Sequence, residues 1–247
     1  MRVTGLVATT ALLSVLVSAA PSPILAQDAS DTVTLSVVAG DDIRFTALTA
    51  EEGLSSGNVY DITQDEQGFM WFATGDGLSR YDGYSFRIFR FDRENPNSLN
   101  SNVVHAVHRG RGNVLWIGTT SGGVDRFDLA TETFTHYRHD PDDPNSLSGN
   151  SIQAKSILED PEGMVWIGTI ERGLNRLDPA TGTFTHYRHD PDDPNSLSSD
   201  QIRIIHQDSD GMVWIGTPGS GLNRLDPDTG EVTRYLPDPD DPHALPD

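Results

Sequence analysis

The stretch that decides the fold is "GMVWIGTPGSGLNRLD", Gly211–Asp226, because the chain contains three further near-copies of it. The earlier copies read "GFMWFATGDGLSRYDG", "GNVLWIGTTSGGVDRFD" and "GMVWIGTIERGLNRLD". Each copy holds one of the 4 tryptophans of the chain, and their spacings are 45, 50 and 48 residues: Trp71, Trp116, Trp166 and Trp214. A repeat of this period predicts a solenoid, a propeller or an array of like units.

The interior of the fourth copy distinguishes among these folds. Its short apolar-rich runs are separated by turn-forming sequences, and the runs are Ile202–Gln207, Met212–Gly216, Leu222–Leu225 and Val232–Leu236. Such a pattern predicts a four-stranded antiparallel meander, which is typical of a β-propeller blade. Helical repeats would need apolar residues at a spacing of 3.6, and the sequence has no such stripe. We therefore predict an all-β propeller with four four-stranded blades, at about residues 55–92, 101–139, 150–189 and 199–237.

A second phrase, "FTHYRHDPDDPNSLS", occurs unchanged at Phe134–Ser148 and Phe184–Ser198. Together with "DxxGxxWIGTxxGLxRxD", it resembles the two-component regulator propeller repeat, and the resemblance covers about residues 43–245. That family forms the periplasmic sensing part of large hybrid histidine kinases. The resemblance implies a seven-bladed ring, often two in tandem, followed by a further β-domain, a membrane helix and a signalling module. The four blades would then be part of such a ring.

The N-terminus has the features of an export signal. Arg2 precedes the apolar run Leu6–Ala20, which is followed by small residues suited to cleavage. The run is short for a membrane span of about 20 residues. We predict a signal peptide over 1–26, a linker over 27–42 and the propeller over 43–247, in a periplasmic or secreted protein. The sequence leaves open whether cleavage falls near Ala20 or after Ala26.

Composition excludes several classes of function. The chain has no cysteine, so disulfides and thiolate chemistry are excluded. The formal net charge is −20, and Lys155 is the only lysine. Because a field of that sign repels phosphate groups, we expect no nucleic-acid partner.

The residues that recur in every copy have structural roles. We expect the tryptophans to pack one blade against the next, with Trp116, Trp166 and Trp214 buried and Trp71 less covered. Gly118, Gly168 and Gly216 are expected to leave room for close backbone approach. The arginines of the third strand occupy one position in every copy, which spreads them around the ring: Arg80, Arg126, Arg176 and Arg224.

Two catalytic hypotheses follow from the motifs, and the repeat disfavours both. Two HxxH pairs, His136 with His139 and His186 with His189, lie at strand ends. Residues three apart on a strand point to opposite faces, so neither pair can chelate one ion. The phrase "DxxGxxW" resembles the structural Asp-box hairpin of sialidases, which keeps a glycan-active propeller enzyme as an alternative. We predict no catalytic residue and no cofactor in this segment.

Acidic connectors follow the fourth strands. Their aspartates recur at matched places: Asp140, Asp142, Asp143, Asp190, Asp192, Asp193, Asp238, Asp240 and Asp241. Clustered carboxylates could bind Ca²⁺, but the paired prolines favour a rigid solvated connector. A calcium-stiffened interaction scaffold is therefore a further alternative. Because strand direction alternates, these connectors should share a face of the propeller with the turns between second and third strands.

Positions that differ among the copies are candidates for ligand binding, because scaffold positions repeat. The first strand of each blade should line the channel. There, one predicted column holds Tyr60, Val104, Lys155 and Arg203, and the next holds Asp61, His105, Ser156 and Ile204. The third copy has two extra residues near Gln153–Ala154, which predicts a bulge. The selected candidate ligand-binding residues are Tyr60, His105, Lys155, Arg203, Glu171 and Arg172.

We therefore predict an exported, non-enzymatic sensor module that binds an extracellular ligand, with a glycan as one class. The expected partners are other propeller or signalling domains of a longer chain, and a homodimer stays open. The ends of the chain predict an open arc. Ile43–Leu48 parallels a fourth strand without its first three, while the last copy already has Val232–Leu236. Such an arc would expose an apolar edge.

Overall fold

The computed structural model describes residues 46–241 and 244–245. Two compact units divide the chain, 1–45 and 46–247, and the fold below is that of the second. The predicted signal peptide, the predicted linker and residues 43–45 of the predicted strand Ile43–Leu48 lie outside the described residues. Within residues 46–241 and 244–245 there is no helix of the length and apolarity that a membrane span requires.

Sixteen strands make up the regular structure of the described residues. In the first two blades these are β1 (Val59–Gln64), β2 (Met70–Thr74), β3 (Gly77–Tyr81), β4 (Phe86–Phe89), β5 (Val104–Arg109), β6 (Val114–Thr119), β7 (Val124–Asp128) and β8 (Thr133–Tyr137). In the last two they are β9 (Ile152–Glu159), β10 (Val165–Thr169), β11 (Leu174–Asp178), β12 (Thr183–Tyr187), β13 (Ile204–Gln207), β14 (Val213–Thr217), β15 (Gly221–Leu225) and β16 (Val232–Tyr235).

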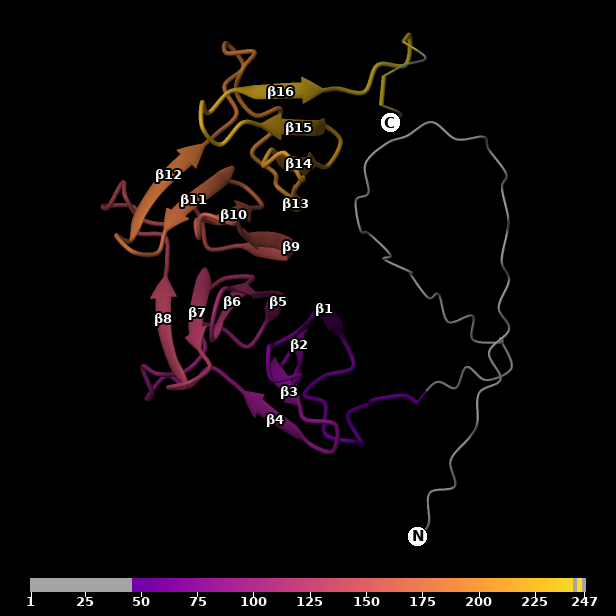
Figure 1. The fold of residues 1–247 in the computed structure, drawn as a ribbon, viewed down its shortest axis with the longest axis vertical. Coiled ribbons are helices and arrows are strands. Elements are labelled where there is room, and N and C mark those ends of the chain that lie inside the picture. Colours follow the sequence, from indigo (N-terminus) through magenta and orange to yellow (C-terminus); the bar gives the residue numbers. More distant parts are fainter. Residues whose placement is uncertain (1–45, 242–243, 246–247) are drawn as a thin grey trace, which may run out of the picture. The chain divides into compact units, whose positions relative to one another are not determined.

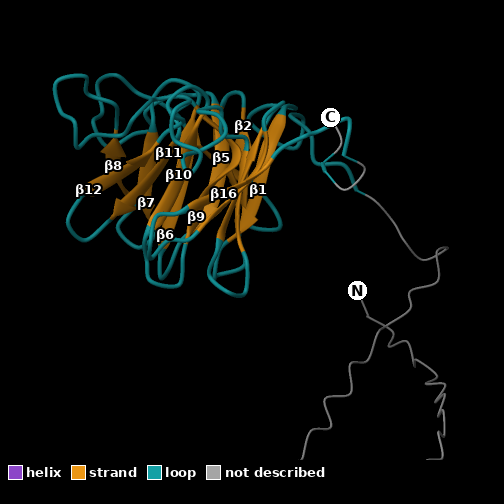
Figure 2. Ribbon diagram, turned by 90° about the horizontal axis from the view of Figure 1, so that it is seen from above, coloured by secondary structure: helices purple, strands orange, loops and turns teal. Residues whose placement is uncertain are grey.

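Each blade is a four-stranded antiparallel meander in which neighbours in sequence are neighbours in the sheet. This confirms the predicted all-β fold of four four-stranded blades. The blades lie side by side in an arc, with β1, β5, β9 and β13 on its inner side (Figure 1). Loops gather at the two ends of the strands (Figure 2). The structure contradicts the predicted strand at Ile43–Leu48 where it is described, because 46–48 is irregular and each sheet already has four strands.

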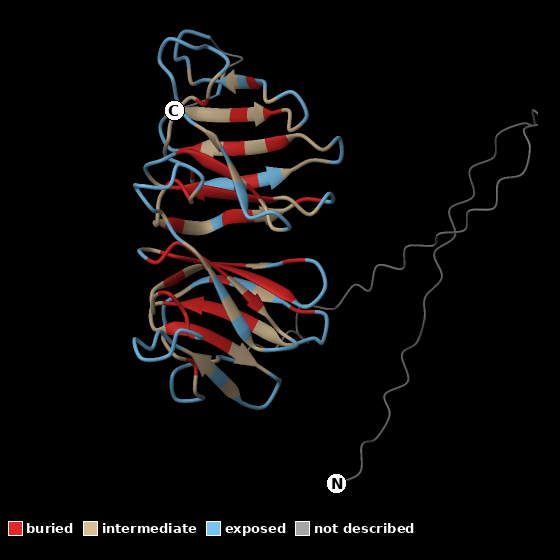
Figure 3. Cartoon of the chain, turned by 90° about the vertical axis from the view of Figure 1, so that its left-hand side faces the viewer, coloured by how far each residue is buried: buried red, intermediate tan, exposed pale blue. Residues whose placement is uncertain are grey.

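The apolar core consists of three clusters, one between each pair of consecutive blades. Buried residues, red in Figure 3, are concentrated on the second and third strands of blades 1–3, whereas the fourth strands β4, β8 and β12 have none. In the cluster between blades 1 and 2, Trp71 lies with its ring centroid 5.9 Å from that of Phe127. The cluster between blades 3 and 4 joins Trp166 to Val213 and Leu225. Trp71, Trp116 and Trp166 thus each pack against the blade that follows in sequence.

Because the tryptophans pack in this direction, the predicted burial was wrong for Trp71 and for Trp214. Trp71 is 0% exposed, although we expected it to be less covered. Trp116 and Trp166 are buried as predicted, whereas Trp214 is only half-buried. The reason is that Trp71 is covered by blade 2, while no blade of the described chain follows Trp214.

Glycines make close packing of the blades possible. A Cβ on Gly118 would collide with the Ile152 side chain, and one on Gly168 would collide with Ile202. Both isoleucines lie at the inner edge of the next blade and are buried. The predicted role of these two glycines is therefore confirmed.

The repeated arginines and acids hold the tryptophans in place. The Arg176 guanidinium lies 5.1 Å from the Trp166 ring, and Asp160 accepts a hydrogen bond of 2.9 Å from the Trp166 indole. The same two contacts occur at Trp71 and at Trp214. These polar residues are therefore part of the scaffold.

Candidate ligand-binding site

Irregular pairing interrupts the innermost strand of blades 1–3 near its start. In blade 1, Val59 pairs with Thr74 and Asp61 with Ala73, so Tyr60 is an extra residue. In blade 2, His105 is extra in the same way. Blade 3 has a longer irregularity between Ile152 and Ile157, which confirms its two extra residues. Such bulges redirect side chains out of the regular alternation of a strand.

The positions of the bulges show that the predicted column of variable residues was wrong in blade 2. Ala106 pairs with Gly118, just as Asp61 pairs with Ala73, so His105 is the counterpart of Tyr60. Val104, which we predicted in that place, is instead buried against blade 1. The predicted alignment of blade 2 was wrong by one residue, because apolar spacing alone does not locate a bulge. The corrected column holds four different side chains: Tyr60, His105, Lys155 and Arg203.

Three of these side chains interact on the inner side of the arc: Tyr60, His105 and Arg203. The rings of Tyr60 and His105 lie with centroids 4.0 Å apart. Burial, and secondarily the positive charge of Arg203, lowers the pKa of His105. Tyr60 is 41% exposed, so the aromatic pair is open to a ligand.

Lys155 joins the group through a buried carboxylate that the sequence analysis did not select. Its ammonium forms an ion pair with Asp61, whose carboxylate also accepts a hydrogen bond of 3.2 Å from the backbone N–H of Val107. Lys155 has a φ of 61°, which is strained for a residue other than glycine. Strain of this kind persists where the surrounding structure holds it, and it is concentrated at functional sites.

The other two predicted residues lie elsewhere. Glu171 and Arg172 belong to the turn between β10 and β11, and Glu171 is exposed. Arg172 lines a separate pocket of about 280 Å³ together with connector residues such as Asp140 and Ser146. The predicted sharing of one face by connectors and turns is therefore correct, but Arg172 does not join the inner group.

The connector aspartates cap the backbone of their own loops. Asp140 accepts a hydrogen bond of 3.0 Å from the N–H of Asp142, and Asp143 accepts one of 2.9 Å from that of Asn145. The connector of blade 3 repeats both contacts. These capped turns give the connectors a rigid form. A calcium-stiffened connector stays an alternative, and the absence of a cofactor stays a prediction.

The repeated histidines fasten connectors to strands. The Nδ1 of His139 lies 2.9 Å from the Leu147 carbonyl, and that of His189 lies 2.6 Å from the Leu197 carbonyl. The Nε2 of His186 lies 2.9 Å from the carbonyl of Ser146 in the preceding connector.

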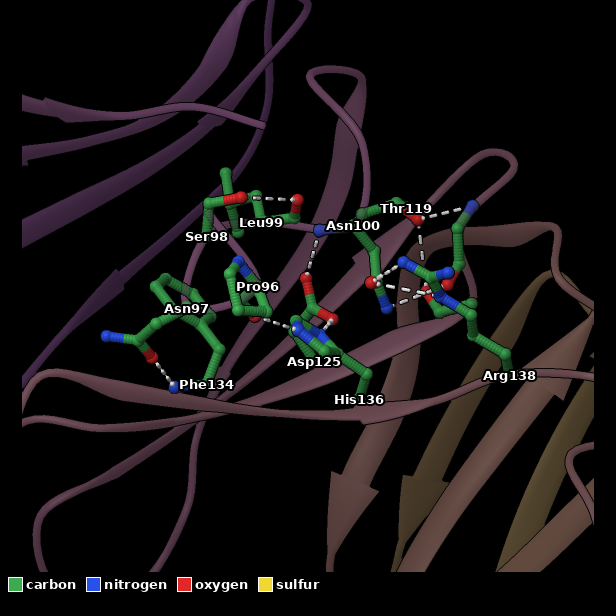
Figure 4. Close-up of polar contacts among 12 residues, drawn as sticks. Pro96, Asn97, Ser98, Leu99, Asn100, Thr119, Asp125, Phe134, His136 and Arg138 are labelled. Carbon is green, nitrogen blue, oxygen red and sulfur yellow. Dashed lines mark hydrogen bonds and ion pairs between the residues drawn. The ribbon is translucent and has the colours of Figure 1, made fainter. Parts of the chain in front are cut away.

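His136 differs from the other strand-end histidines because it faces a buried acid (Figure 4). Its Nδ1 lies 2.7 Å from Asp125 Oδ1, and its Nε2 lies 2.9 Å from the Pro96 carbonyl. When Asp125 is ionised both partners are acceptors, so the imidazole then carries a proton on each nitrogen to make both bonds. The bond to Asp125 raises the pKa of His136, and burial raises the pKa of Asp125. Blade 3 has Asn175 in place of the acid, and burial lowers the pKa of His186 there.

This difference predicts that the pKa values of His136 and His186 are shifted in opposite directions, although the two strands have the same sequence. His136 should titrate above about 6.5, the ordinary histidine pKa, and His186 below it. The stability that protonation of His136 provides should be complete below that value and should be lost as pH rises through its folded-state pKa. Asp125→Asn should lower the pKa of His136, and Asn175→Asp should raise that of His186. Imidazole proton NMR, assigned with His136→Gln, measures both, and equal pKa values in the parent chain would contradict the prediction.

Blade 2 departs from the other blades at the acid that binds tryptophan. Gly110 stands where the other blades have Asp65, Asp160 and Asp208. The Trp116 indole instead donates a hydrogen bond of 2.7 Å to Glu159, which belongs to β9 of the next blade. A Cβ on Gly110 would lie 2.8 Å from the Trp116 Nε1, so the glycine provides the space for this exchange.

Comparison with known proteins agrees with this architecture. The two component regulator propeller model matches residues 53–76, 146–171 and 196–219. A relative described as Histidine kinase P4 from Formosa agariphila is 42% identical over 55 residues, which is 22% of this chain and 4% of the relative.

Two solved structures are similar to this chain over most of its length. The extracellular domain of the putative hybrid two component system BT3049 from B. thetaiotaomicron is 33% identical, with a TM-score of 0.70 over 77% of this chain and 26% of that one. That of the putative one component system BT4673 from the same organism has a TM-score of 0.61 at 23% identity, over 75% of this chain and 25% of that one. The chain thus spans about a quarter of each structure.

Four repeated antiparallel blades, packed against one another through buried tryptophans, define a β-propeller repeat protein. Three segments of the chain match the two component regulator propeller model. Its propeller is like that in the extracellular domain of the putative hybrid two component system BT3049.

Proposed function

We propose that this chain is the exported, non-enzymatic ligand-binding segment of a two-component sensor. The observation that carries the proposal is the corrected column on the inner strands. The repeat keeps its tryptophans and turn residues from blade to blade, yet Tyr60, His105, Lys155 and Arg203 are all different. A purely structural position would be expected to repeat like its neighbours.

The chemistry of the column suits a glycan. Sugar rings stack on aromatic faces, and Tyr60 with His105 offers a partly exposed aromatic pair. Arg203 and Lys155 provide charged hydrogen-bond donors beside it. The non-enzymatic part of the proposal is supported by the structural roles of the repeated acids and arginines, which bind tryptophans.

An oligosaccharide array with neutral and acidic members tests the proposal. The secreted chain should bind a subset of the array, and Tyr60→Ala should weaken that binding at least about tenfold, which is the effect of losing about 1.4 kcal/mol. Tyr84→Ala is the matched control, because this tyrosine is 94% exposed in the turn between β3 and β4. Absence of binding, or equal effects of the two substitutions, would contradict the glycan site. Turnover of chromogenic glycosides would contradict the absence of catalysis.

A further inference from the structure

The connectors after blades 2 and 3 meet the fourth strand of the next blade at the same position. We call residues 140–148 connector 2 and residues 190–198 connector 3, and their sequences are identical. Cross-strand pairing with Asn175 and Asn223 makes His186 and Arg234 equivalent residues of blades 3 and 4. His186 contacts connector 2, and Arg234 contacts connector 3. One loop sequence thus meets two different side chains.

In connector 3, the guanidinium of Arg234 lies in a cradle of backbone carbonyls. Its Nε donates a hydrogen bond of 2.6 Å to the Ser196 carbonyl, and its Nη2 donates bonds of 2.7 and 3.1 Å to the Asp193 and Leu197 carbonyls. The same Nη2 lies 3.4 Å from the Asp190 carbonyl and 2.5 Å from Ser196 Oγ. Hydrogen bonds from a charged, planar donor are stronger than neutral ones. Connector 3 is therefore a guanidinium site that the chain fills itself.

Connector 2 has the same internal hydrogen bonds as connector 3. Ser146 Oγ donates a bond of 2.9 Å to the Asp140 carbonyl, and the N–H of Ser146 donates one of 3.1 Å to the Asp143 carbonyl. The corresponding bonds of connector 3 are 2.9 and 3.2 Å long. Because a carbonyl oxygen has two lone pairs, these bonds still leave room for a second donor, as the contacts of Arg234 demonstrate. The carbonyls of connector 2 thus form the same cradle.

His186 fills only one position of this cradle. Its Nε2 lies 2.9 Å from the Ser146 carbonyl, which is the contact that corresponds to that of Arg234 Nε. Within the described residues, the imidazole makes no contact like those of Arg234 Nη2. A pocket of about 280 Å³ lies here, lined by His186, Ser146 and the aspartates Asp140 and Asp143. This volume is close to the lower limit of about 300 Å³ for ligand sites, so the pocket suits a small ligand.

A buried hydroxyl also lines this pocket. Ser148 is 2% exposed, and its Oγ has no hydrogen-bond partner within the described residues. In connector 3, the Oγ of the equivalent Ser198 lies 2.9 Å from both Thr217 Oγ1 and Asn223 Nδ2. A buried polar group without a partner is costly. A polar ligand group in the pocket would remove that cost.

The charged side chains of the pocket favour a ligand with two opposite charges. The carboxylates of Asp140 and Asp143 line it on the connector side and attract a cation. Arg172 and Arg188 line it as well and are exposed, whereas Ser148 is buried, so the arginines lie at the entrance. Each arginine can pair with a carboxylate in bidentate geometry. Because their charge would repel a bare cation, the favoured ligand has a carboxylate beside its cationic group.

We propose that connector 2 binds a ligand that carries both a guanidinium group and a carboxylate, as free arginine and peptides with a C-terminal arginine do. The guanidinium takes the place that Arg234 occupies in connector 3 and donates to the corresponding carbonyls. The carboxylate pairs with Arg172 and Arg188. This second site goes beyond the proposed function, and none of its lining residues belongs to the column on the inner strands.

Isothermal titration calorimetry of the secreted chain with L-arginine measures the binding. We expect saturable binding, and L-lysine should bind at least about tenfold more weakly, because its ammonium lacks the planar fork of donors. His186→Arg should raise the dissociation constant for L-arginine at least about tenfold, because the new side chain fills the cradle as Arg234 does. Thr183→Arg is the matched control. It adds the same charge at the exposed start of β12, opposite Asp178, and should leave the binding unchanged.

A second measurement places the ligand without any substitution in the pocket. In the parent chain, L-arginine should shift the imidazole proton signal of His186 with the dissociation constant that calorimetry gives. His186→Arg should fold like the parent chain, because it reproduces the arrangement of blade 4. No saturable binding, equal binding of L-lysine, or undiminished binding by His186→Arg would overturn the proposal.

Two further compounds test the carboxylate and identify the source of the ligand. Agmatine has the guanidinium group without the carboxylate, and it should bind more weakly than L-arginine. Equal binding of agmatine would overturn the assignment of Arg172 and Arg188. Binding of the tripeptide Gly-Gly-Arg as tight as that of L-arginine would assign the site to a peptide end, and binding of L-arginine alone would assign it to the free amino acid; either result supports the site. Glycans do not enter these experiments, so their outcome is independent of the proposed function.

Discussion

Replacing Trp166 by alanine should lower the free energy of unfolding by about 3–5 kcal/mol, the usual cost of removing a buried tryptophan. Trp166 is 0% exposed and packs in the cluster between blades 3 and 4. The substitution also leaves Asp160 and Arg176 without the ring that both contact.

Trp214→Ala is the matched comparison within the same chain. Trp214 keeps the same contacts to its own blade, with Asp208 at 2.7 Å and Tyr235 at 5.6 Å, but it lacks a following blade. We expect its loss to cost less than half as much as that of Trp166, or about 2 kcal/mol at most. Denaturant unfolding followed by far-UV circular dichroism measures both. Equal losses for the two substitutions would contradict the proposed direction of packing.

The second large effect concerns the hydrogen bond between blades 2 and 3. Glu159→Ala should destabilise the chain by about 1–3 kcal/mol, because it leaves the Trp116 indole N–H without an acceptor in a largely buried place. Glu159 also accepts a hydrogen bond of 3.2 Å from the backbone N–H of Arg111, which would be lost as well.

Adding Gly110→Asp should restore most of the stability that Glu159→Ala removes. In blade 3, Asp160 binds the indole and also accepts two backbone hydrogen bonds, from Glu162 at 3.1 Å and Met164 at 2.8 Å. Aspartate at 110 can make the same contacts once Glu159 is removed and the Trp116 ring moves slightly, because its Cβ would otherwise lie 2.8 Å from the indole Nε1. In the presence of Glu159 it should be destabilising, because its Cβ would lie only 2.5 Å from that carboxylate. The double variant should therefore regain most of the stability that each single variant loses. Additive losses in a double-mutant cycle of urea midpoints would show that Glu159 does not replace the missing acid.

The fold could be predicted because its determinants are local and repeated. Turn sequences such as "DSDG" and "DPDTG" separate strands of four or five residues, and the observed β13–β16 agree with the predicted runs to within two residues. An antiparallel meander needs only such short-range signals, since each strand pairs with its neighbour in sequence. The family resemblance rested on the same repeated residues.

The candidate site could be predicted only in part. Variation among copies pointed to Tyr60, Lys155 and Arg203, but it also selected Glu171 and Arg172, which lie away from the inner strands. Asp61 was not selected, because nothing in sequence shows that a carboxylate of blade 1 meets the lysine of blade 3. Gly110 and Asp125 differ visibly from their counterparts in the other copies. Their contacts could not be predicted, because the contact partners lie in other blades or in connectors.

The sequence by itself determined the period, the four strands of each blade and the positions of the scaffold residues. These depend on turn chemistry and on alternation within one strand, which are encoded within a few residues of each other. Three features became visible only in the tertiary structure. Trp71, Trp116 and Trp166 face the following blade, and blade 2 buries Trp71 whereas Trp214 is only half-buried. Glu159 of blade 3 accepts the indole hydrogen bond that an aspartate accepts in the other blades. The physical reason is that these contacts join residues about 40 to 95 positions apart, across faces whose direction the period of a repeat does not specify.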